Sequence, residues 1–156
     1  MEKSIVEIYR DDLRFLLRLK ASVSILHNRL HDNLAVTAIE ELKKKHPGTK
    51  FSYTKAGASG IDITGIKRRE IKVVAEVKTT LPDEKGRLRG PQTKTILKDL
   101  QRLSDHKHAE SRYLIVLSPT TKRAIEKQLK TRTKFPMIKI FNALDENYSE
   151  SKEDES

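Results

Sequence analysis

Two short apolar stretches, separated by a charged tip, constrain the fold of this chain most strongly. Residues 61–64 and 71–79 are rich in isoleucine and valine, which favour strands, and the tip between them reads Lys67-Arg68-Arg69-Glu70. The pattern predicts an antiparallel hairpin. A turn centred on Arg69 would place Asp62 directly opposite Glu76, with their Cβ atoms roughly 4.5–5.5 Å apart.

Three ionisable side chains fall on one face of this predicted hairpin. Strand side chains alternate with a period of two, so Lys78 shares the face of Glu76, and Asp62 faces both from the other strand. Two opposed carboxylates repel each other and need a cation. A bound metal ion is the more economical explanation, and an ordinary sheet pair neutralised by Lys78 is the alternative.

Length and composition indicate one domain without covalent cross-links. The chain has 156 residues, 36% apolar and 35% charged, and no cysteine, which excludes disulfides, thiolate metal sites and cysteine nucleophiles. We expect a single domain over residues 1–144, made of an N-terminal helical segment (1–30) and a core (31–144). An acidic tail over residues 145–156 is expected to be disordered.

The charge is unevenly distributed. The net charge is +10, and because residues 142–156 hold six acidic residues against one lysine, the rest of the chain carries +15. Such a basic body favours polyanions, of which nucleic acid is the commonest, although a lysine-rich solvated surface of the kind found in heat-stable proteins would look similar. No apolar stretch approaches the roughly 20 residues of a membrane span, and no signal-peptide core follows the start. We therefore expect a cytoplasmic location and no membrane partner.

The hydrophobic periodicity predicts a mixed α/β order. Residues 5–30 read as one long helix or as two shorter ones divided near Asp11-Asp12, and a further helix over 32–45 is ended by His46-Pro47-Gly48. Strands are predicted at 50–54, 61–64, 71–79, 113–117 and 137–141, with helices beginning at Pro91 and after Ser118-Pro119. This order predicts a mixed sheet flanked by helices.

The residues on the hairpin face suit phosphodiester cleavage, which needs charge neutralisation at the phosphate and an activated water. Mg²⁺ prefers oxygen ligands and takes one or two carboxylates, which Asp62 and Glu76 supply, with the main-chain carbonyl of Val77 as a third oxygen. Lys78 would orient the attacking water or help to deprotonate it. The sequence contains no Gly-Lys-Ser/Thr phosphate loop, so no nucleotide cofactor is expected.

The segments Gly60-Ile61-Asp62 and Glu76-Val77-Lys78 resemble the signature of the PD-(D/E)XK nuclease superfamily, which includes type II restriction endonucleases, Holliday-junction resolvases and repair nucleases. The resemblance covers roughly residues 32–141, with Ile61 in place of the family's proline. It implies a restriction-endonuclease-like fold with an α-βββ-α-β core. It also implies that Asp62 and Glu76 bind the metal and that Lys78 assists the water.

Two further positions follow from the same resemblance. Asp32 matches an acidic metal ligand on the helix before the strands, with Glu40 and Glu41 as rivals and helix N-capping as its structural alternative. Gln92 matches a catalytic glutamine near the metal or the phosphate, and its alternative is an exposed residue in the first helical turn.

Basic residues surround the predicted site in the sequence. The candidates for DNA binding are Lys55, Arg87, Arg89 and Lys94. Lys85 lies in the same loop as Arg87 and Arg89. The leading hypothesis is a Mg²⁺-dependent DNA endonuclease, active also with Mn²⁺, of restriction type and homodimeric. A junction or repair nuclease of the same fold, a non-catalytic DNA-binding subunit, and a basic scaffold for RNA or protein remain alternatives. The DNA target and the choice between one and two metals stay open.

The acidic tail yields a first prediction. If residues 145–156 compete with a polyanion for the basic body, their deletion will tighten binding to duplex DNA at low salt, and the gain will shrink as salt is added. Fluorescence anisotropy at two salt concentrations measures this. Equal affinity of the full and shortened chains would show that the tail does not mask the basic surface.

Overall fold

The structure is a computed structural model that describes the backbone of residues 5–144 and the side chains of residues 10–144. The acidic tail, predicted to be disordered, lies outside the described residues. The elements are α1 (Ile5–Lys45), β1 (Lys50–Tyr53), β2 (Ile63–Lys67), β3 (Glu70–Lys78), α2 (Gly90–Asp105), β4 (Ser111–Val116), α3 (Pro119–Leu129), α4 (Thr131–Lys134) and β5 (Ile138–Asn142).

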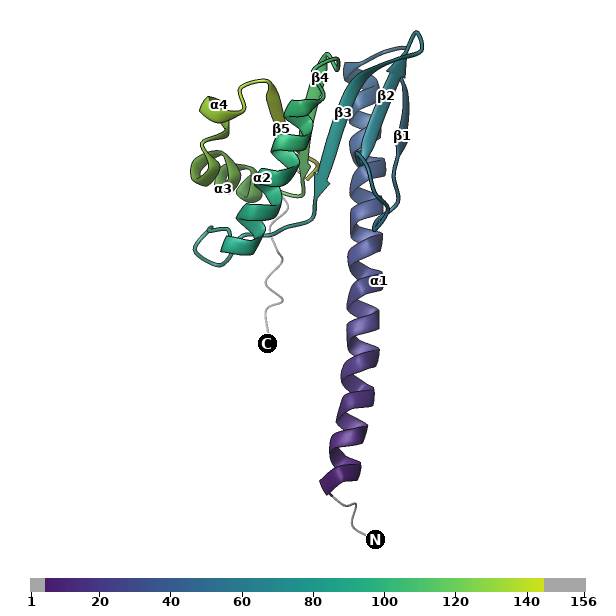
Figure 1. Ribbon diagram of the computed structural model, residues 1–156, viewed down its shortest axis with the longest axis vertical. Helices are drawn as coiled ribbons and strands as arrows, with labels where there is room; N and C mark the ends of the chain where they lie inside the picture. Colours follow the sequence, from purple (N-terminus) through teal and green to yellow (C-terminus); the bar gives the residue numbers. More distant parts are fainter. Residues whose placement is uncertain (1–4, 145–156) are drawn as a thin grey trace, which may run out of the picture.

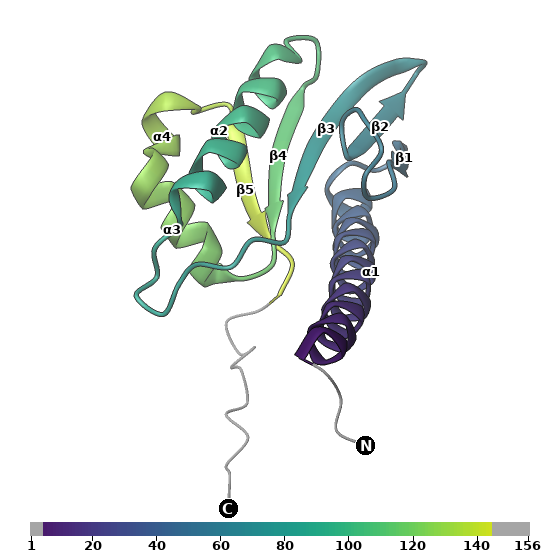
Figure 2. The same ribbon diagram turned by 60° about the horizontal axis from the view of Figure 1, so that its bottom comes forward.

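A five-stranded mixed sheet forms the centre of the molecule. Its strands lie in the order β1-β2-β3-β4-β5; β1, β2 and β3 pair antiparallel, and β3, β4 and β5 pair parallel. Helix α1 covers one face of the sheet, and α2 and α3 cover the other (Figures 1 and 2). The expected mixed α/β architecture with helices on both faces is confirmed.

The β2–β3 hairpin has the predicted tip but a different turn centre. Arg68 and Arg69 both have positive φ angles, 53° and 66°, as the two central residues of a tight primed hairpin turn do. The turn is therefore centred between these two residues and not on Arg69. A register shift beside Gly65 compensates for the half-residue difference, and Ile63 faces Ala75 as predicted.

Helix α1 is continuous, so the predicted division of residues 5–45 into separate helices is wrong. No glycine or proline occurs between Ile5 and Lys45, and nothing in this stretch interrupts the backbone hydrogen bonds. The helix ends where predicted, before Pro47 and before Gly48, whose φ of +75° is a left-handed conformation that suits glycine.

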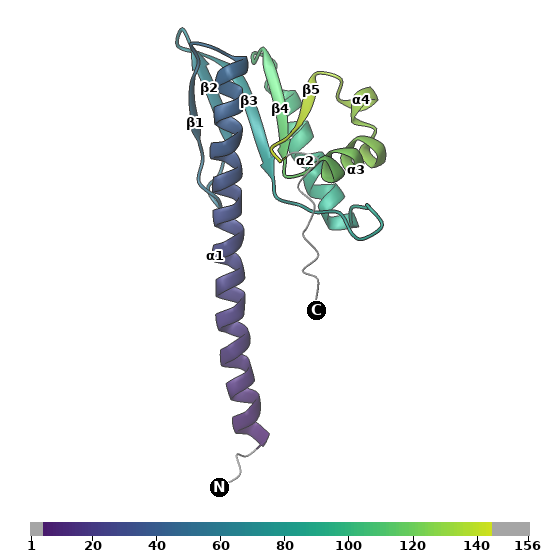
Figure 3. The ribbon, with the colours of Figure 1, turned by 180° about the vertical axis from the view of Figure 1, so that it is seen from behind.

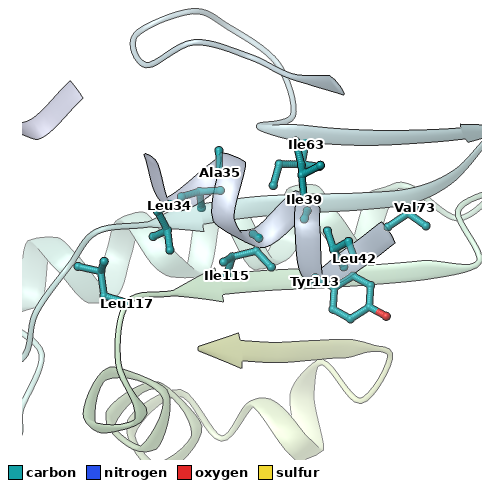
Figure 4. Close-up of a cluster of buried hydrophobic side chains, with 12 residues drawn as sticks. Leu34, Ala35, Ile39, Leu42, Ile63, Val73, Tyr113, Ile115 and Leu117 are labelled. Carbon is teal, nitrogen blue, oxygen red and sulfur yellow. The ribbon is translucent and has the colours of Figure 1, made fainter. Parts of the chain in front are cut away.

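Among the described side chains of α1, residues 10–45, those of its C-terminal third pack on the sheet. Leu34, Ala35, Ala38, Ile39 and Leu42, spaced by three or four residues, are buried against the sheet (Figure 4). Residues 10–30 are exposed, and this half of the helix extends beyond the rest of the molecule (Figures 1 and 3).

The opposite face of the sheet carries a second core. Val74, Leu114 and Val116 from the strands pack there with residues of α2 and α3. Since Val73, Ala75 and Val77 face α1, the even-numbered positions of β3 face α2. Glu76 and Lys78 therefore point toward α2, and this fixes which helix completes the site.

Helices α2 and α3 begin close to their predicted first residues. Pro91 lies in the first turn of α2, where its missing N–H costs nothing. The Ser118 side chain caps α3 by accepting a hydrogen bond from the Thr121 N–H. The short helix α4 was not predicted.

Close packing at Gly65 yields a prediction on stability. A Cβ atom there would lie 2.7 Å from Phe51 Cε1, 2.9 Å from Thr49 Cγ2 and 3.0 Å from Val73 Cβ. Gly65→Ala should therefore lower the free energy of unfolding by about 1–3 kcal/mol, measured by urea denaturation. Gly90→Ala is the matched control, because a Cβ there meets no described atom within 4 Å. Equal stability of the two variants would contradict the packing argument.

Candidate active site

The predicted catalytic residues meet in an open cleft of about 650 Å³ at the end of β3. Asp62 directly precedes β2, and Glu76 and Lys78 lie in the last three residues of β3. Helix α1, the loop before β2 and helix α2 complete the walls. The remaining lining includes His27, His31, Gly60, Gln92, Lys98, Asp99 and Arg102.

Asp62 is held in place by the neighbouring strand and by α1. Its Oδ2 accepts a hydrogen bond of 2.8 Å from the Val77 N–H. Its Oδ1 lies 3.4 Å from Nε2 of His31. The ladder pair Ile63–Ala75 continues to this point, so Asp62 lies beside Glu76 as the hairpin register predicts.

Glu76 is a carboxyl in the protein interior, with only 2% of its surface exposed. Its Oε1 accepts a hydrogen bond of 2.9 Å from Arg102 of α2. The same guanidinium donates to the carbonyl of Gly60 at 3.2 Å. Arg102 thus ties the buried carboxyl to the loop that carries Asp62.

The two adjacent carboxyls share the cost of burial unequally. The pKa of Glu76 is raised to about 8, first by burial, then by the hydrogen bond to Asp62, and also by the negative charges of Asp62 and Asp99. The positive charge of Arg102 opposes this rise with a smaller effect. Burial also acts to raise the pKa of Asp62, but hydrogen bonds with His31, Glu76 and the Val77 N–H outweigh it and lower that pKa. The two carboxyls therefore titrate as a coupled pair, in which Glu76 keeps its proton to the higher pH.

His31 is a part of the site that the sequence did not reveal. Its hydrogen bond to Asp62 raises its pKa, with burial opposing and Asp32 adding to the effect. The ring contacts both acids, with Nδ1 3.4 Å from Oδ1 of Asp32. A histidine inside a long helix carries no signal in a single sequence, since its approach to Asp62 depends on how α1 crosses the sheet.

Helix α2 supplies two more charged groups, Asp99 and Arg102, which the sequence analysis also missed. Lys78 forms an ion pair with Asp99, whose side chain is 7% exposed. Arg102 lies one turn further, 3.7 Å from Asp99. A signal for Asp99 was present, because an acid stands inside the apolar stripe of Ile96, Leu100 and Leu103.

Asp32 lies beside the site and not in it. It is in the interior of α1, which excludes N-capping, and its Oδ1 accepts the Ala56 N–H at 3.1 Å. The carboxylate therefore anchors the loop before Asp62 and reaches Asp62 only through His31. The rivals Glu40 and Glu41 form ion pairs with Lys43 and Lys44 on the helix surface.

Gln92 lines the cleft but its side chain is already engaged. Its Oε1 accepts the Arg89 N–H at 2.8 Å, and its Nε2 donates to the Leu81 carbonyl at 3.4 Å. These contacts close the N-terminus of α2. The geometry assigns Gln92 a structural contact and leaves its predicted catalytic role a prediction.

The predicted DNA-binding residues are dispersed. Arg89 lines a smaller adjoining cleft of about 400 Å³, which shares Gln92 with the main one. Lys55, Arg87 and Lys94 are exposed outside both clefts, and Arg87 lies 3.5 Å from Asp83. Among the basic residues, Lys98 joins Lys78 and Arg102 in lining the main cleft. The hairpin tip lies at the far end of β2 and β3 (Figure 1).

The donor set is compatible with a hard divalent cation. Within residues 10–144 no three histidine, aspartate or glutamate side chains converge as a ready metal cage. Mg²⁺ needs no such cage, since it keeps several waters and uses one or two carboxylates. Asp62 and Glu76, held together at the cost of a displaced pKa, fit that requirement.

Comparisons with protein-family models, with curated proteins and with solved structures give no match to this chain. In the part of the chain that the structure describes, no helix is both long and apolar enough to cross a membrane.

The buried carboxyl predicts a pH dependence of stability in EDTA. Because the pKa of Glu76 is about 8 in the folded protein and ordinarily 4.5, the folded state binds more protons between these values. The free energy of unfolding should fall as the pH rises through this window, by at most about 1.4 kcal/mol per pH unit from this group.

The variant Glu76→Gln should flatten that fall, measured by urea unfolding at pH 5, 6.5 and 8. The raised pKa of His31 acts in the same direction above pH 6.5 and remains in the variant, so some slope will persist. Glu70→Gln is the matched control, since Glu70 is exposed at the other end of β3. An unchanged slope in Glu76→Gln would show that Glu76 does not hold the proton.

Proposed function

We propose that this protein is a metal-dependent DNA endonuclease of the PD-(D/E)XK type, built on a restriction-endonuclease-like variant of its mixed α/β fold. One observation carries the proposal: Asp62 and Glu76 lie side by side in an open cleft, with Lys78 on the same strand two residues further on. This is the arrangement that the resemblance implies.

The energetic cost of the arrangement supports a functional role. A carboxyl that is 2% exposed beside a second carboxyl destabilises the folded state unless a proton or a cation compensates. A site that served only stability would gain from an apolar residue at position 76. Strongly displaced pKa values in a cleft are typical of sites that bind a cation or transfer protons.

Asp62, Glu76 and the main-chain carbonyl of Val77 would hold a Mg²⁺ ion, with Mn²⁺ as a substitute. When bound, that cation supplies charge neutralisation at the phosphate and a more acidic water. Holding it requires Glu76 to lose its proton, so binding should improve as the pH approaches 8. The Val77 N–H keeps Asp62 oriented throughout.

Lys78 acts as a cation and hydrogen-bond donor in this proposal. Its ion pair with Asp99 holds the amine at the edge of the cleft. From there it orients the attacking water and stabilises the charge that develops on the phosphate. Asp99 is then a positioning residue, which acts through Lys78.

The substrate follows from the charge around the cleft. Arg102 and Lys98 line it, and the chain without its acidic tail carries +15, both of which favour a phosphate backbone. Arg102 donates to Glu76 and Gly60 and still has 39% of its side chain exposed, so its guanidinium can also reach a phosphate in the cleft. Restriction-type cleavage leads over junction or repair cleavage only because the long N-terminal helix exceeds a minimal nuclease core.

The test is cleavage of supercoiled plasmid, four-way junction and flapped DNA with Mg²⁺, Mn²⁺ or EDTA. The protein should cut at least one of these substrates with either metal and none with EDTA. Glu76→Ala should abolish cleavage, and Lys78→Ala should slow it by about 10²–10⁴-fold while DNA binding persists. The substrate profile identifies the subclass.

Glu70→Ala, purified in parallel, is the matched control for contaminating nucleases, because it removes a glutamate from the same strand away from the cleft. It should retain full activity. Tight DNA binding without cleavage of any substrate would favour the non-catalytic DNA-binding subunit. Equal activity in Lys78→Ala would remove that residue from the mechanism.

A further inference from the structure

The N-terminal part of α1 exposes an apolar surface that the domain does not cover. Figures 1 and 3 show this segment extending past the sheet, and its large apolar side chains are between 41% and 71% exposed. They are Leu13, Phe15, Leu16, Leu17, Leu19, Val23, Ile25, Leu26 and Leu30. Monomeric proteins rarely leave so many large apolar side chains on one element in water.

Five of these side chains form a regular seam. Leu16, Leu19, Val23, Leu26 and Leu30 are spaced 3, 4, 3 and 4 residues apart, which is the a/d pattern of a coiled coil. We refer to these five residues as the seam. The repeat ends on both sides of the seam, because the preceding d position is Asp12 and the following d position is Asn33.

The seam and the sheet-packing residues of α1 lie on different sides of the helix. At 100° per residue, the seam is centred roughly 110° around the helix axis from the face formed by Leu34, Ala35, Ala38, Ile39 and Leu42. In the C-terminal part of α1, which lies beside the sheet, the side of the helix in line with the seam is polar and carries Asn33, Thr37 and Glu41. Sheet packing therefore does not use the seam, and a second helix can lie along it; His27, which flanks the seam, also lines the main cleft.

We propose that the seam pairs with the seam of a second copy of this chain to form a parallel, in-register, two-stranded coiled coil. Leucine at both d positions and valine at the central a position suit two parallel strands. The partner must be a helix with the same 3-4 spacing, because side chains of one helix pack as knobs into holes of the other only when both follow this repeat.

The seam itself selects the parallel orientation. Only parallel, in-register pairing matches all five apolar layers with one another. An antiparallel pairing that matches a with d positions places Leu30 against Asp12 or Leu16 against Asn33, and so loses a layer.

The flanking residues allow this pairing. Lys20 and His27 occupy the e positions, and Phe15, Ser22 and Arg29 the g positions. Parallel pairing brings Phe15 beside Lys20 of the second copy, and Ser22 beside its His27. No two like charges oppose each other there.

Parallel pairing has a consequence for the site. Both domains lie at the same end of the paired helices, on opposite sides of the seam, so their two clefts are held by one rigid connection. If the proposed function holds, this geometry provides one active site for each strand of a duplex. The pairing itself rests only on the helix and does not need nuclease activity.

The orientation can be tested by disulfide trapping, since the natural chain contains no cysteine. Leu26→Cys at a d position should form a covalent dimer under mild oxidation at least about tenfold faster than Ile25→Cys, which lies away from the seam and is similarly exposed. If Leu26→Cys does not cross-link although the natural chain sediments as a dimer, the two d positions do not face each other and the parallel proposal is overturned.

Sedimentation equilibrium of the whole chain, without DNA, tests the pairing itself. The natural protein should be a dimer, and Leu26→Glu should raise the dissociation constant at least about 100-fold, because a charge would be buried in the seam. Ile25→Glu is the matched control and should leave it unchanged. Circular dichroism after Leu26→Glu should still show a folded domain, since position 26 makes no contact with the sheet. A monomer at all concentrations, or equal effects of the two substitutions, would overturn the proposal.

Discussion

The pairing of β2 with β3 is the interaction on which the site depends. It places Asp62 beside Glu76, and the hydrogen bond from the Val77 N–H fixes the Asp62 carboxylate at 2.8 Å. Two acids in such contact repel each other, and their burial raises the pKa of Glu76 to about 8. The sheet thus holds a charge arrangement that is unfavourable in itself, and the surrounding groups follow from the need to compensate it.

Helices α1 and α2 supply that compensation from opposite faces of the sheet. Arg102 donates to Glu76, Asp99 pairs with Lys78, and His31 approaches Asp62 from α1. These contacts give the carboxyls of Asp62, Glu76 and Asp99 polar or charged partners within the protein, which lowers the cost of burying them. The proposed metal and phosphate would enter this network.

The two parts of helix α1 have different environments. Its C-terminal third packs on the sheet and carries His31 to the site, while residues 10–30 leave the domain. The apolar side chains of these two parts lie on different sides of the helix. One set packs on the sheet, and the other is available to the second helix proposed above. The exposure of residues 10–30 shows that this part of the helix does not cover the sheet.

The sequence by itself determined the five strands, most of the helices and the central residues of the site. The two apolar stretches and the charged tip between them predicted the hairpin, and its register brought Asp62, Glu76 and Lys78 together. This worked because the pairing of two strands joined by a short turn follows from the spacing of residues along the chain. Only the tertiary structure decided which residues surround them. His31, Asp99 and Arg102 reach the cleft because α1 and α2 cross opposite faces of the sheet, and Asp32 misses it by one position on its helix. Such contacts depend on how whole elements pack, and a pattern of spacing along the chain does not contain that information.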